Sequence, residues 1–331
     1  MKALLFKNRF LLLAIATTLV LPLVLSSGSL ATEVLIFAIA ALGCNLLLGY
    51  TGLLSFGQGI FFGVGSYAAG LLAIRAGLPL VAIVPCAVLF GAVSAALVGW
   101  LSIRRQGVYF VLLTLAFSQM FYFVAYTLPD WTGGDNGLLG VPRLPLQVFG
   151  VTLLPADTAW QYYVIVALIF ILTFWFMQRV VDSVFGHTLI AIRENEERTN
   201  AVGYDVKQFK IAAFTISGAV TGVAGALYAM MTGIAPLESI EYRTSELILI
   251  ITVIGGTGNL FGSVIGAAFY VIVADMLSTI WPRWLLMLGV LLMAISLYMQ
   301  QGLWGVIVKL TGYLRGREGR RHGAVIVKGK P

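Results

Sequence analysis

Few residues in this sequence have the chemistry of catalytic groups, and they lie far apart. The chain has two histidines, His187 and His322, and neither an HExxH nor a GxSxG pattern occurs. Glu246 and Asp275 are the acidic residues within strongly apolar stretches, and they are not spaced as a carboxylate pair for proton transfer. These features predict a protein without a catalytic site of its own.

Nucleotide and metal chemistry are also not indicated. The glycine-rich stretch 255–268 contains Asn259, but no lysine completes a GxxxxGK(S/T) phosphate-binding pattern there or elsewhere. The two cysteines, Cys44 and Cys86, lie within apolar stretches, where they are expected to be small packing residues. The sequence therefore predicts no metal and no cofactor bound by this chain.

One polar interval, residues 185–214, carries helix-forming charge. Its charged run extends to Arg198 and is followed by Gly203, which can take the left-handed conformation that ends a helix. Glu194 and Arg198 are four residues apart, and such a pair stabilises a helix by roughly 0.3–0.5 kcal/mol. We therefore expect one short helix here, exposed to water.

The rest of the chain is strongly apolar. Hydrophobic residues make up 60% and charged residues 11%, and the mean hydropathy of +0.95 is typical of polytopic membrane proteins. About 20 apolar residues cross a bilayer as a helix. Applied along the chain, this length predicts an all-α fold with about ten transmembrane helices, at 10–27, 34–50, 59–75, 80–102, 107–128, 160–179, 209–231, 245–257, 260–281 and 284–301.

The basic residues indicate the orientation of these helices. If the N-terminus is cytoplasmic, ten crossings place the intervals 103–106 and 180–208 and a basic tail at 302–331 in the cytoplasm, and a loop at 129–159 outside. All but four of the 21 basic residues then lie in the cytoplasm, as expected of membrane proteins. The charge of +7 comes from these segment ends, so it does not indicate nucleic-acid binding. We predict a single transmembrane domain over residues 1–331.

Three features of the predicted spans have alternative interpretations. The first span also resembles a signal peptide that is cleaved before Thr32, although we expect it to be retained. The span 245–257 is short, but without it the basic tail would lie outside, so we keep it as a tilted span. Five spans on each side of the external loop suggest an inverted 5+5 repeat.

Glycines are concentrated between the second and third predicted spans, in GYTGLLSFGQGIFFGVGSYAAG. Each glycine weakens a helix by roughly 1 kcal/mol relative to alanine. One explanation is close helix packing through Gly59, Gly63 and Gly70. The other is a helix break near 51–57 that exposes backbone groups to a water-filled path. Gln58 slightly favours the break, because an amide should face protein or water.

The external loop 129–159 is rich in turn residues. Gly133, Gly134 and Gly137 tolerate the positive φ angles of tight turns. The loop is either a compact connection or a docking surface for a protein that delivers a substrate. In both cases Trp131 fits an anchor at the membrane interface.

Five separated motifs give the chain a family resemblance. They are NLLLGYTGLLSFGQGIFFGVGSYAA, RRQGVYFVLLTLAFSQMFYF, WTGGDNGL, GHTLIAIRENEERTNAVGYDVKQFKIAAF and GGTGNLFGSVIGA. Through them the chain resembles, over about residues 30–310, the LivM-type permease subunits of bacterial branched-chain amino acid ABC importers. The motifs are less specific for the substrate, because importers of urea and amides have similar permeases.

The resemblance implies a division of labour in a bacterial inner membrane, with both termini of this chain cytoplasmic. A second, LivH-like permease would enclose the path, two ATP-binding subunits would bind ATP and Mg²⁺, and a periplasmic binding protein would deliver the substrate. The substrate would be a branched-chain or related amino acid. The alternatives are a urea or amide permease, a stand-alone carrier driven by an ion gradient, and a channel-like or structural membrane protein.

The resemblance also implies that the polar helix couples this chain to an ATP-binding subunit by docking in a groove. Leu189, Ile192 and the aliphatic part of Arg193 would anchor it. A helix on the membrane surface is the alternative, which anionic lipid would disfavour because the helix is acidic. The predicted coupling residues are Gly186, Leu189, Ile192, Arg193, Glu194, Asn195, Arg198 and Gly203.

A zwitterionic amino acid cannot cross hydrocarbon unaided, because its charges would lose their water. The path must therefore offer dipoles and water. Our candidates are Asn45, Ser55, Gln58 and Gln119. A structural hydrogen bond between helices is the alternative role for each polar side chain of this kind.

Overall fold

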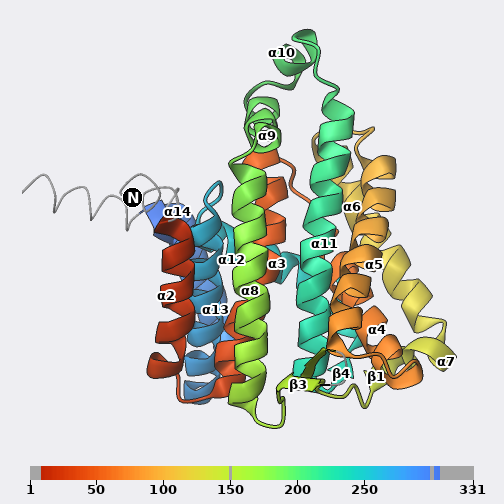
Figure 1. The fold of residues 1–331 in the computed structure, drawn as a ribbon. Coiled ribbons are helices and arrows are strands. Elements are labelled where there is room, and N and C mark those ends of the chain that lie inside the picture. Colours follow the sequence, from red (N-terminus) through yellow and green to blue (C-terminus); the bar gives the residue numbers. More distant parts are fainter. Residues whose placement is uncertain (1–8, 149–150, 299–301, 306–331) are drawn as a thin grey trace, which may run out of the picture.

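Helices form most of the protein and pack together in a bundle (Figure 1). The computed structural model describes residues 9–148, 151–298 and 302–305. The first helices are α2 (Arg9–Val24), α3 (Gly28–Asn45) with its π-helical extension η1 (Leu46–Thr51), α4 (Gln58–Arg75), α5 (Leu80–Ser102) and α6 (Val108–Tyr126). The later ones are α8 (Ala159–Val181), α9 (Val184–Glu194), α10 (Glu196–Ala201), α11 (Val206–Thr232), α12 (Tyr242–Gly255), α13 (Leu260–Ile280) and α14 (Trp284–Tyr298). The predicted helical fold is confirmed.

The short elements are α7 (Pro129–Thr132), η2 (Gly134–Asn136), β1 (Leu138–Leu139), β2 (Leu146–Val148), β3 (Val151–Leu154), β4 (Ile234–Ala235) and η3 (Leu237–Ser239). Of these, α7, β1, β3 and β4 lie at the lower end of the bundle in Figure 1. β2 and β3 pair in an antiparallel arrangement. β1 pairs with β4, with Leu138 opposite Ala235, and this pairing joins the loop after α6 to the end of α11.

Among the described residues, six helical segments are long and apolar enough to cross a membrane: α3 with η1, α5, α6, α8, α11 and α13. The other four predicted spans coincide with α2, α4, α12 and α14, which are shorter or less apolar. The count of ten spans therefore stays a prediction. From residue 306 on, the predicted basic tail lies outside the described residues.

α11 packs against α3, α4 and α5 in the interior of the bundle. Glycine allows the backbones of α4 and α11 to approach closely, since a Cβ atom at Gly65 would collide with the backbone of Gly222. A Cβ atom at Gly63 would likewise collide with Ile240. Close packing therefore explains part of the glycine content.

The predicted helix break is present as well. η1 ends at Thr51, Gly52 has a φ of 74°, and α4 begins only at Gln58. A second non-helical stretch, interrupted only by η3, leads from β4 into α12. Close packing and a helix break thus occur in the same region, and the water-filled path beside the break stays a prediction.

The first turns of α4 and α12 meet inside the bundle. The Gly59 amide donates a hydrogen bond to Ser245 Oγ (2.7 Å), and this hydroxyl donates to the Phe56 carbonyl (2.6 Å). From this contact the two helices run to opposite ends. Arg75 at the end of α4 bonds to the Asp130 carbonyl in the lower loop, whereas the turn after α12 lies beside α3 and η1.

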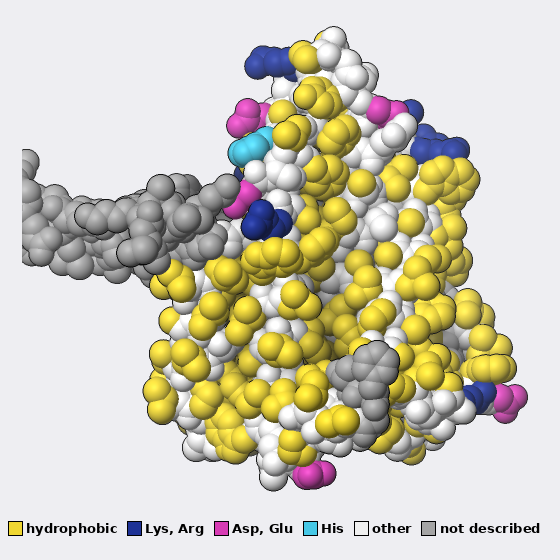
Figure 2. Space-filling view, in the orientation of Figure 1, with side chains coloured by type: hydrophobic (Ala, Val, Ile, Leu, Met, Phe, Trp, Pro, Cys, Tyr) yellow, Lys and Arg dark blue, Asp and Glu magenta, His cyan; other side chains and the backbone are white. Residues whose placement is uncertain are grey.

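The two ends of the bundle are built differently. α9 and α10 extend beyond it at one end, and α7, β1 and β3 lie at the other (Figure 1). Charged side chains gather near both ends, and hydrophobic side chains cover the surface between them (Figure 2). The predicted intervals 180–208 and 129–159 therefore lie at opposite ends of an apolar bundle.

Candidate functional site

The polar interval after α8 folds as two helices. α9 begins after Ser183, whose hydroxyl accepts a hydrogen bond from the Gly186 amide. Asn195 is extended, with a φ of −159°, and its Oδ1 accepts from the Arg198 amide at 2.8 Å, which caps α10. The prediction of a single helix is therefore wrong at Asn195, a residue type that favours caps over helix interiors.

The apolar face of α9 is turned toward the bundle, where it packs against η1, α8 and α11. Leu189 is 0% exposed and Ile192 is 3% exposed. Gly186 is buried too, against the backbone of Val181. The prediction that Leu189 and Ile192 anchor α9 in a partner's groove is therefore wrong for these side chains, because their own chain covers them.

Arg193 joins α9 to the end of the long α3–η1 helix. Its guanidinium donates a hydrogen bond to the Gly49 carbonyl, and its aliphatic carbons lie beside Gly52. Carbonyl groups in the last turn of a helix lack partners within the helix, so an arginine placed there satisfies one of them. This side chain too is engaged with its own chain.

Glu196 is the charged centre of the site. Its Oε2 lies 2.6 Å from Lys210 Nζ, and its Oε1 accepts a hydrogen bond from Gln106 Nε2 at 3.2 Å. The predicted pair of Glu194 and Arg198 does not occur among the ion pairs of the described residues. The extended residue between α9 and α10 breaks the helical spacing on which that pair depends.

Sequence reasoning missed the role of Lys210. This lysine precedes the apolar run of α11 and is only 5% exposed. A buried ammonium group is costly without an anionic partner. A lysine at the start of an apolar helix, with a cluster of acidic residues a few turns earlier, was the signal that could have revealed the pair.

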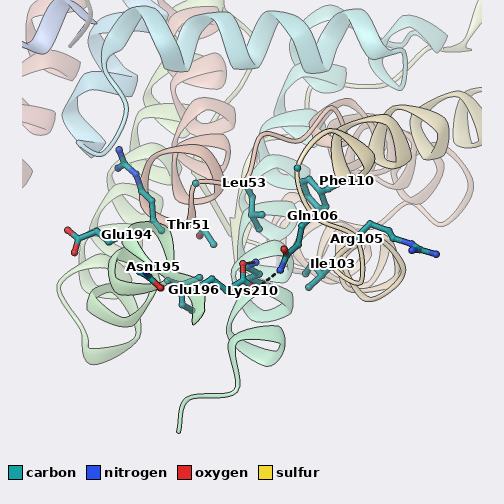
Figure 3. Close-up of a pocket in the computed structure, with 14 residues that line it drawn as sticks. Thr51, Leu53, Ile103, Arg105, Gln106, Phe110, Glu194, Asn195, Glu196 and Lys210 are labelled. Atoms are coloured by element: carbon teal, nitrogen blue, oxygen red, sulfur yellow. Dashed lines mark hydrogen bonds and ion pairs between the residues drawn. The ribbon is translucent and has the colours of Figure 1, made fainter. Parts of the chain in front are cut away.

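These contacts surround a cavity of about 320 Å³ between α9, α10, η1 and the loop before α6 (Figure 3). Gln106, Glu196 and Lys210 converge in it, whereas Arg105 and Glu194 point away (Figure 3). Among the described residues, no three side chains group as metal ligands.

The outer surface of this element ends in an exposed apolar pair. Val202 is 73% exposed and Tyr204 is 41% exposed, in the turn between α10 and α11. We call these two side chains the apolar tip. Gly203 lies between them with a φ of 103°, so its predicted left-handed conformation is confirmed. The apolar tip was not predicted, because it lies outside the helical repeat.

Two of the path candidates are tied to backbone groups inside the chain. Asn45 is fully buried and joins α3 to the turn before α13. Its Nδ2 donates to the Asn259 carbonyl (2.8 Å), and its Oδ1 accepts from the Gly258 amide (2.9 Å). Ser55 is also buried and accepts from the Gly57 amide (3.1 Å). Hydrogen bonding within the bundle accounts for both side chains.

The two glutamines among the candidates differ from each other. Gln58 is fully buried: its Nε2 donates to Ser217 Oγ (3.0 Å), and its Oε1 accepts from Thr221 Oγ1 (2.8 Å). Ser217 in turn donates to the Gly43 carbonyl (2.7 Å), so this network joins α4, α11 and α3. Gln119 instead lies exposed on α6. Of the four candidates, it is the one open to the surroundings.

The loop at the other end has the tight turns expected from its glycines. Gly133, Gly134 and Gly137 have φ angles of 78°, 61° and 68°, which confirms the positive φ angles expected of them. Trp131 is exposed, with the Arg75 guanidinium carbon 4.3 Å from the centre of its ring. Its role as a docking residue stays a prediction.

Comparison with known proteins places this architecture in a family. The family described as "Branched-chain amino acid transport system / permease component" matches residues 26–297. The high-affinity branched-chain amino acid transport system permease protein LivM of Salmonella typhimurium is 30% identical, over 89% of this chain and 74% of that protein. The predicted resemblance to LivM-type permeases is thus confirmed.

More distant relatives have other names. A probable branched-chain amino acid transport permease protein LivM of Methanocaldococcus jannaschii is 25% identical, over 81% of this chain and 90% of that protein. The autoinducer 2 import system permease protein LsrC of Escherichia coli is also 25% identical, over 78% of this chain and 75% of that protein. No solved structure matches the chain.

Proposed function

Because the chain belongs to the family of permease components of branched-chain amino acid transport systems, we propose that it is the membrane-spanning subunit of an ABC importer for branched-chain or related amino acids. The amino acid crosses the inner membrane, and separate subunits hydrolyse ATP. The observation that carries the proposal is the family match over residues 26–297, which contains all six long apolar helices.

α9 and α10 are the proposed coupling element. They extend beyond the bundle at the end that we assign to the cytoplasm, and the sequence has no phosphate-binding loop of its own. The apolar tip docks on one of two ATP-binding subunits. Arg193 and the pair of Glu196 and Lys210 transmit a movement of the apolar tip to the end of η1 and to the start of α11.

α4 and α12 are the proposed equivalent helices of an inverted repeat with ten crossings in all. α4 packs against α11 and α5, and α12 packs against α3 and α13. Each begins inside the bundle after a non-helical stretch, and the two run to opposite ends. Helices interrupted near the middle of the membrane are typical of transporter repeats. Relative movement of α4 and α12 would open the path to each side in turn.

The path itself is proposed to run along the outer face of α6. Gln119 is exposed on this helix between the exposed side chains of Leu112 and Phe123. An amide that faces lipid is unfavourable, so this face is covered by a second, LivH-like permease subunit and by the water of the path. A periplasmic binding protein docks at the opposite end of the bundle from α10, beside Trp131.

Uptake measurements test this function. Deleting the chain in its host should abolish uptake of radiolabelled leucine, isoleucine and valine, and restoring it should recover uptake that stops when ATP is depleted. Uptake that instead persists without ATP and collapses with an uncoupler contradicts the proposal and supports an ion-driven carrier.

A permease for autoinducer 2 is the second candidate, because the LsrC relatives match over 78% of the chain. Urea and amides are further alternatives within such importers. Competition experiments separate these substrates. An excess of unlabelled leucine should suppress the uptake of radiolabelled leucine, whereas urea, acetamide and autoinducer 2 should not. Leucine uptake that is unchanged by deletion of the chain, together with loss of autoinducer 2 uptake, would assign the chain to the second candidate.

A further inference from the structure

A groove runs along the apolar surface between α5, α8 and α11. Residues 215–223 of α11 form its floor, Val84 and Val88 of α5 form one wall, and α8 forms the other wall with Trp175. Its volume is about 470 Å³. Figure 2 shows a hollow in the hydrophobic surface at this position, between α8 and α11 of Figure 1.

Apart from the indole N–H of Trp175, the side chains that line the groove offer no free polar group to an occupant. Of the side chains that line it, Thr173 and Thr215 carry hydroxyl groups, and each donates to the carbonyl four residues earlier, at 2.8 and 2.9 Å. An amino acid, a sugar or an ordered water needs several polar partners. The occupant must therefore be apolar.

The size of the groove favours a thin occupant. A helix with its side chains is about 10 Å across, so a helix of another protein would lie over the groove and not in it. The six long apolar helices place this surface in the bilayer, where acyl chains are the neighbouring molecules. An acyl chain is therefore the occupant that fits both the shape and the surroundings.

A positive charge lies at one end of the groove. Arg179 is exposed on α8 one turn after Trp175, and its guanidinium carbon is 5.5 Å from the centre of that ring. Arginine at the cytoplasmic end of a groove between helices attracts anionic lipid headgroups. The charge is thus placed to hold the headgroup of a lipid whose chain lies beside Trp175.

We propose that this groove binds one anionic phospholipid, with an acyl chain between α5 and α8 and its phosphate at Arg179. The bound acyl chain fills the space between α8 and α11. Both helices lead into the α9–α10 element, so the lipid supports the bundle directly below it. The inference depends on the membrane location of the chain and not on what it transports.

Native mass spectrometry of the full-length chain tests the site. The purified protein is delipidated in a mild detergent and titrated with phosphatidylglycerol or phosphatidylcholine. We expect one phosphatidylglycerol to bind more tightly than phosphatidylcholine. Ala219→Trp, which fills the floor, should remove this binding, and Leu97→Trp on the outer surface of α5 should keep it. Equal binding by Ala219→Trp and the unchanged protein overturns the proposal.

The headgroup contact has a matched control. Arg104 stacks on Trp100 at the end of α5, with 4.8 Å from its guanidinium carbon to the ring centre, outside the groove. Arg179→Gln should lower the affinity for phosphatidylglycerol about fivefold, and Arg104→Gln should leave it unchanged. An unchanged affinity in Arg179→Gln overturns the assignment of the phosphate.

Fluorescence quenching tests the acyl chain with conservative variants that keep the fold. One equivalent of phosphatidylglycerol with brominated acyl chains should quench part of the tryptophan emission in detergent. Trp175→Phe should remove the quenched part, and Trp100→Phe should retain it. Quenching of the same size in Trp175→Phe and the unchanged protein contradicts an acyl chain in this groove.

Discussion

Lys210 of α11 and Glu196 of α10 form an ion pair, with Nζ and Oε2 2.6 Å apart. Lys210 is buried, and Glu196 also accepts a hydrogen bond from Gln106 in the loop before α6. Three segments of the chain therefore meet at one carboxylate. Because a buried ammonium requires an anionic partner, this carboxylate fixes the position of α10 relative to the bundle.

Glu196→Gln should lower the free energy of unfolding by about 1–3 kcal/mol, because it leaves the Lys210 ammonium without an anion. Breaking an ion pair in which both partners are fully buried would lower the free energy of unfolding by more. Thermal unfolding in detergent measures the loss. The exposed Glu197→Gln is the control and should unfold as the unchanged protein does. A double variant, Glu196→Gln with Lys210→Met, should recover part of the loss. If Glu196→Gln and Glu197→Gln unfold at the same temperature, the ion pair of Glu196 and Lys210 does not stabilise the protein.

Val202→Asp should reduce uptake about tenfold or more while the amount of protein in the membrane stays the same. The charge would be placed in the proposed contact with an ATP-binding subunit, and one lost anchor of this kind costs more than about 1.4 kcal/mol. Val184→Asp is a matched control, since Val184 is 75% exposed and Val202 is 73% exposed. Equal uptake by the two variants would remove the apolar tip from the coupling contact.

The positions of the helices could be predicted because apolar runs of sufficient length have few other solutions in a membrane. Even the short predicted span 245–257 overlaps α12, at Tyr242–Gly255. Hydropathy does not report the depth at which a helix begins. Hydropathy therefore could not predict the contact between Gly59 and Ser245 inside the bundle.

The faces of the helices could be predicted less well. An apolar side chain such as Ile192 on an amphipathic helix fits its own bundle and a partner's groove equally, and only the packed structure distinguishes the two. The break at Asn195 had a sequence signal, since asparagine favours caps. The Glu and Arg residues around Asn195 have a higher helix propensity, and they therefore predicted a continuous helix.

Gln58→Leu should lower the free energy of unfolding by about 1–3 kcal/mol, because the Thr221 hydroxyl loses its acceptor and Ser217 keeps only its bond to the Gly43 carbonyl. Gln119→Leu should leave stability unchanged and reduce uptake, because this amide is exposed on α6. Thermal unfolding and uptake of both variants are measured together. Normal uptake by Gln119→Leu would mean that this face of α6 does not line the path.

Gly65→Ala should destabilise the bundle by about 1–3 kcal/mol, although alanine is the better helix former. The added Cβ atom would collide with the backbone of Gly222, so α4 and α11 would have to separate along their shared contact. Gly289→Ala in α14 is the control: its Cβ atom has no neighbour within 4 Å among the described residues, so helix propensity alone should raise stability slightly. The unfolding temperature should therefore fall in Gly65→Ala and rise slightly in Gly289→Ala. A rise in both would show that the backbones of α4 and α11 are not in close contact.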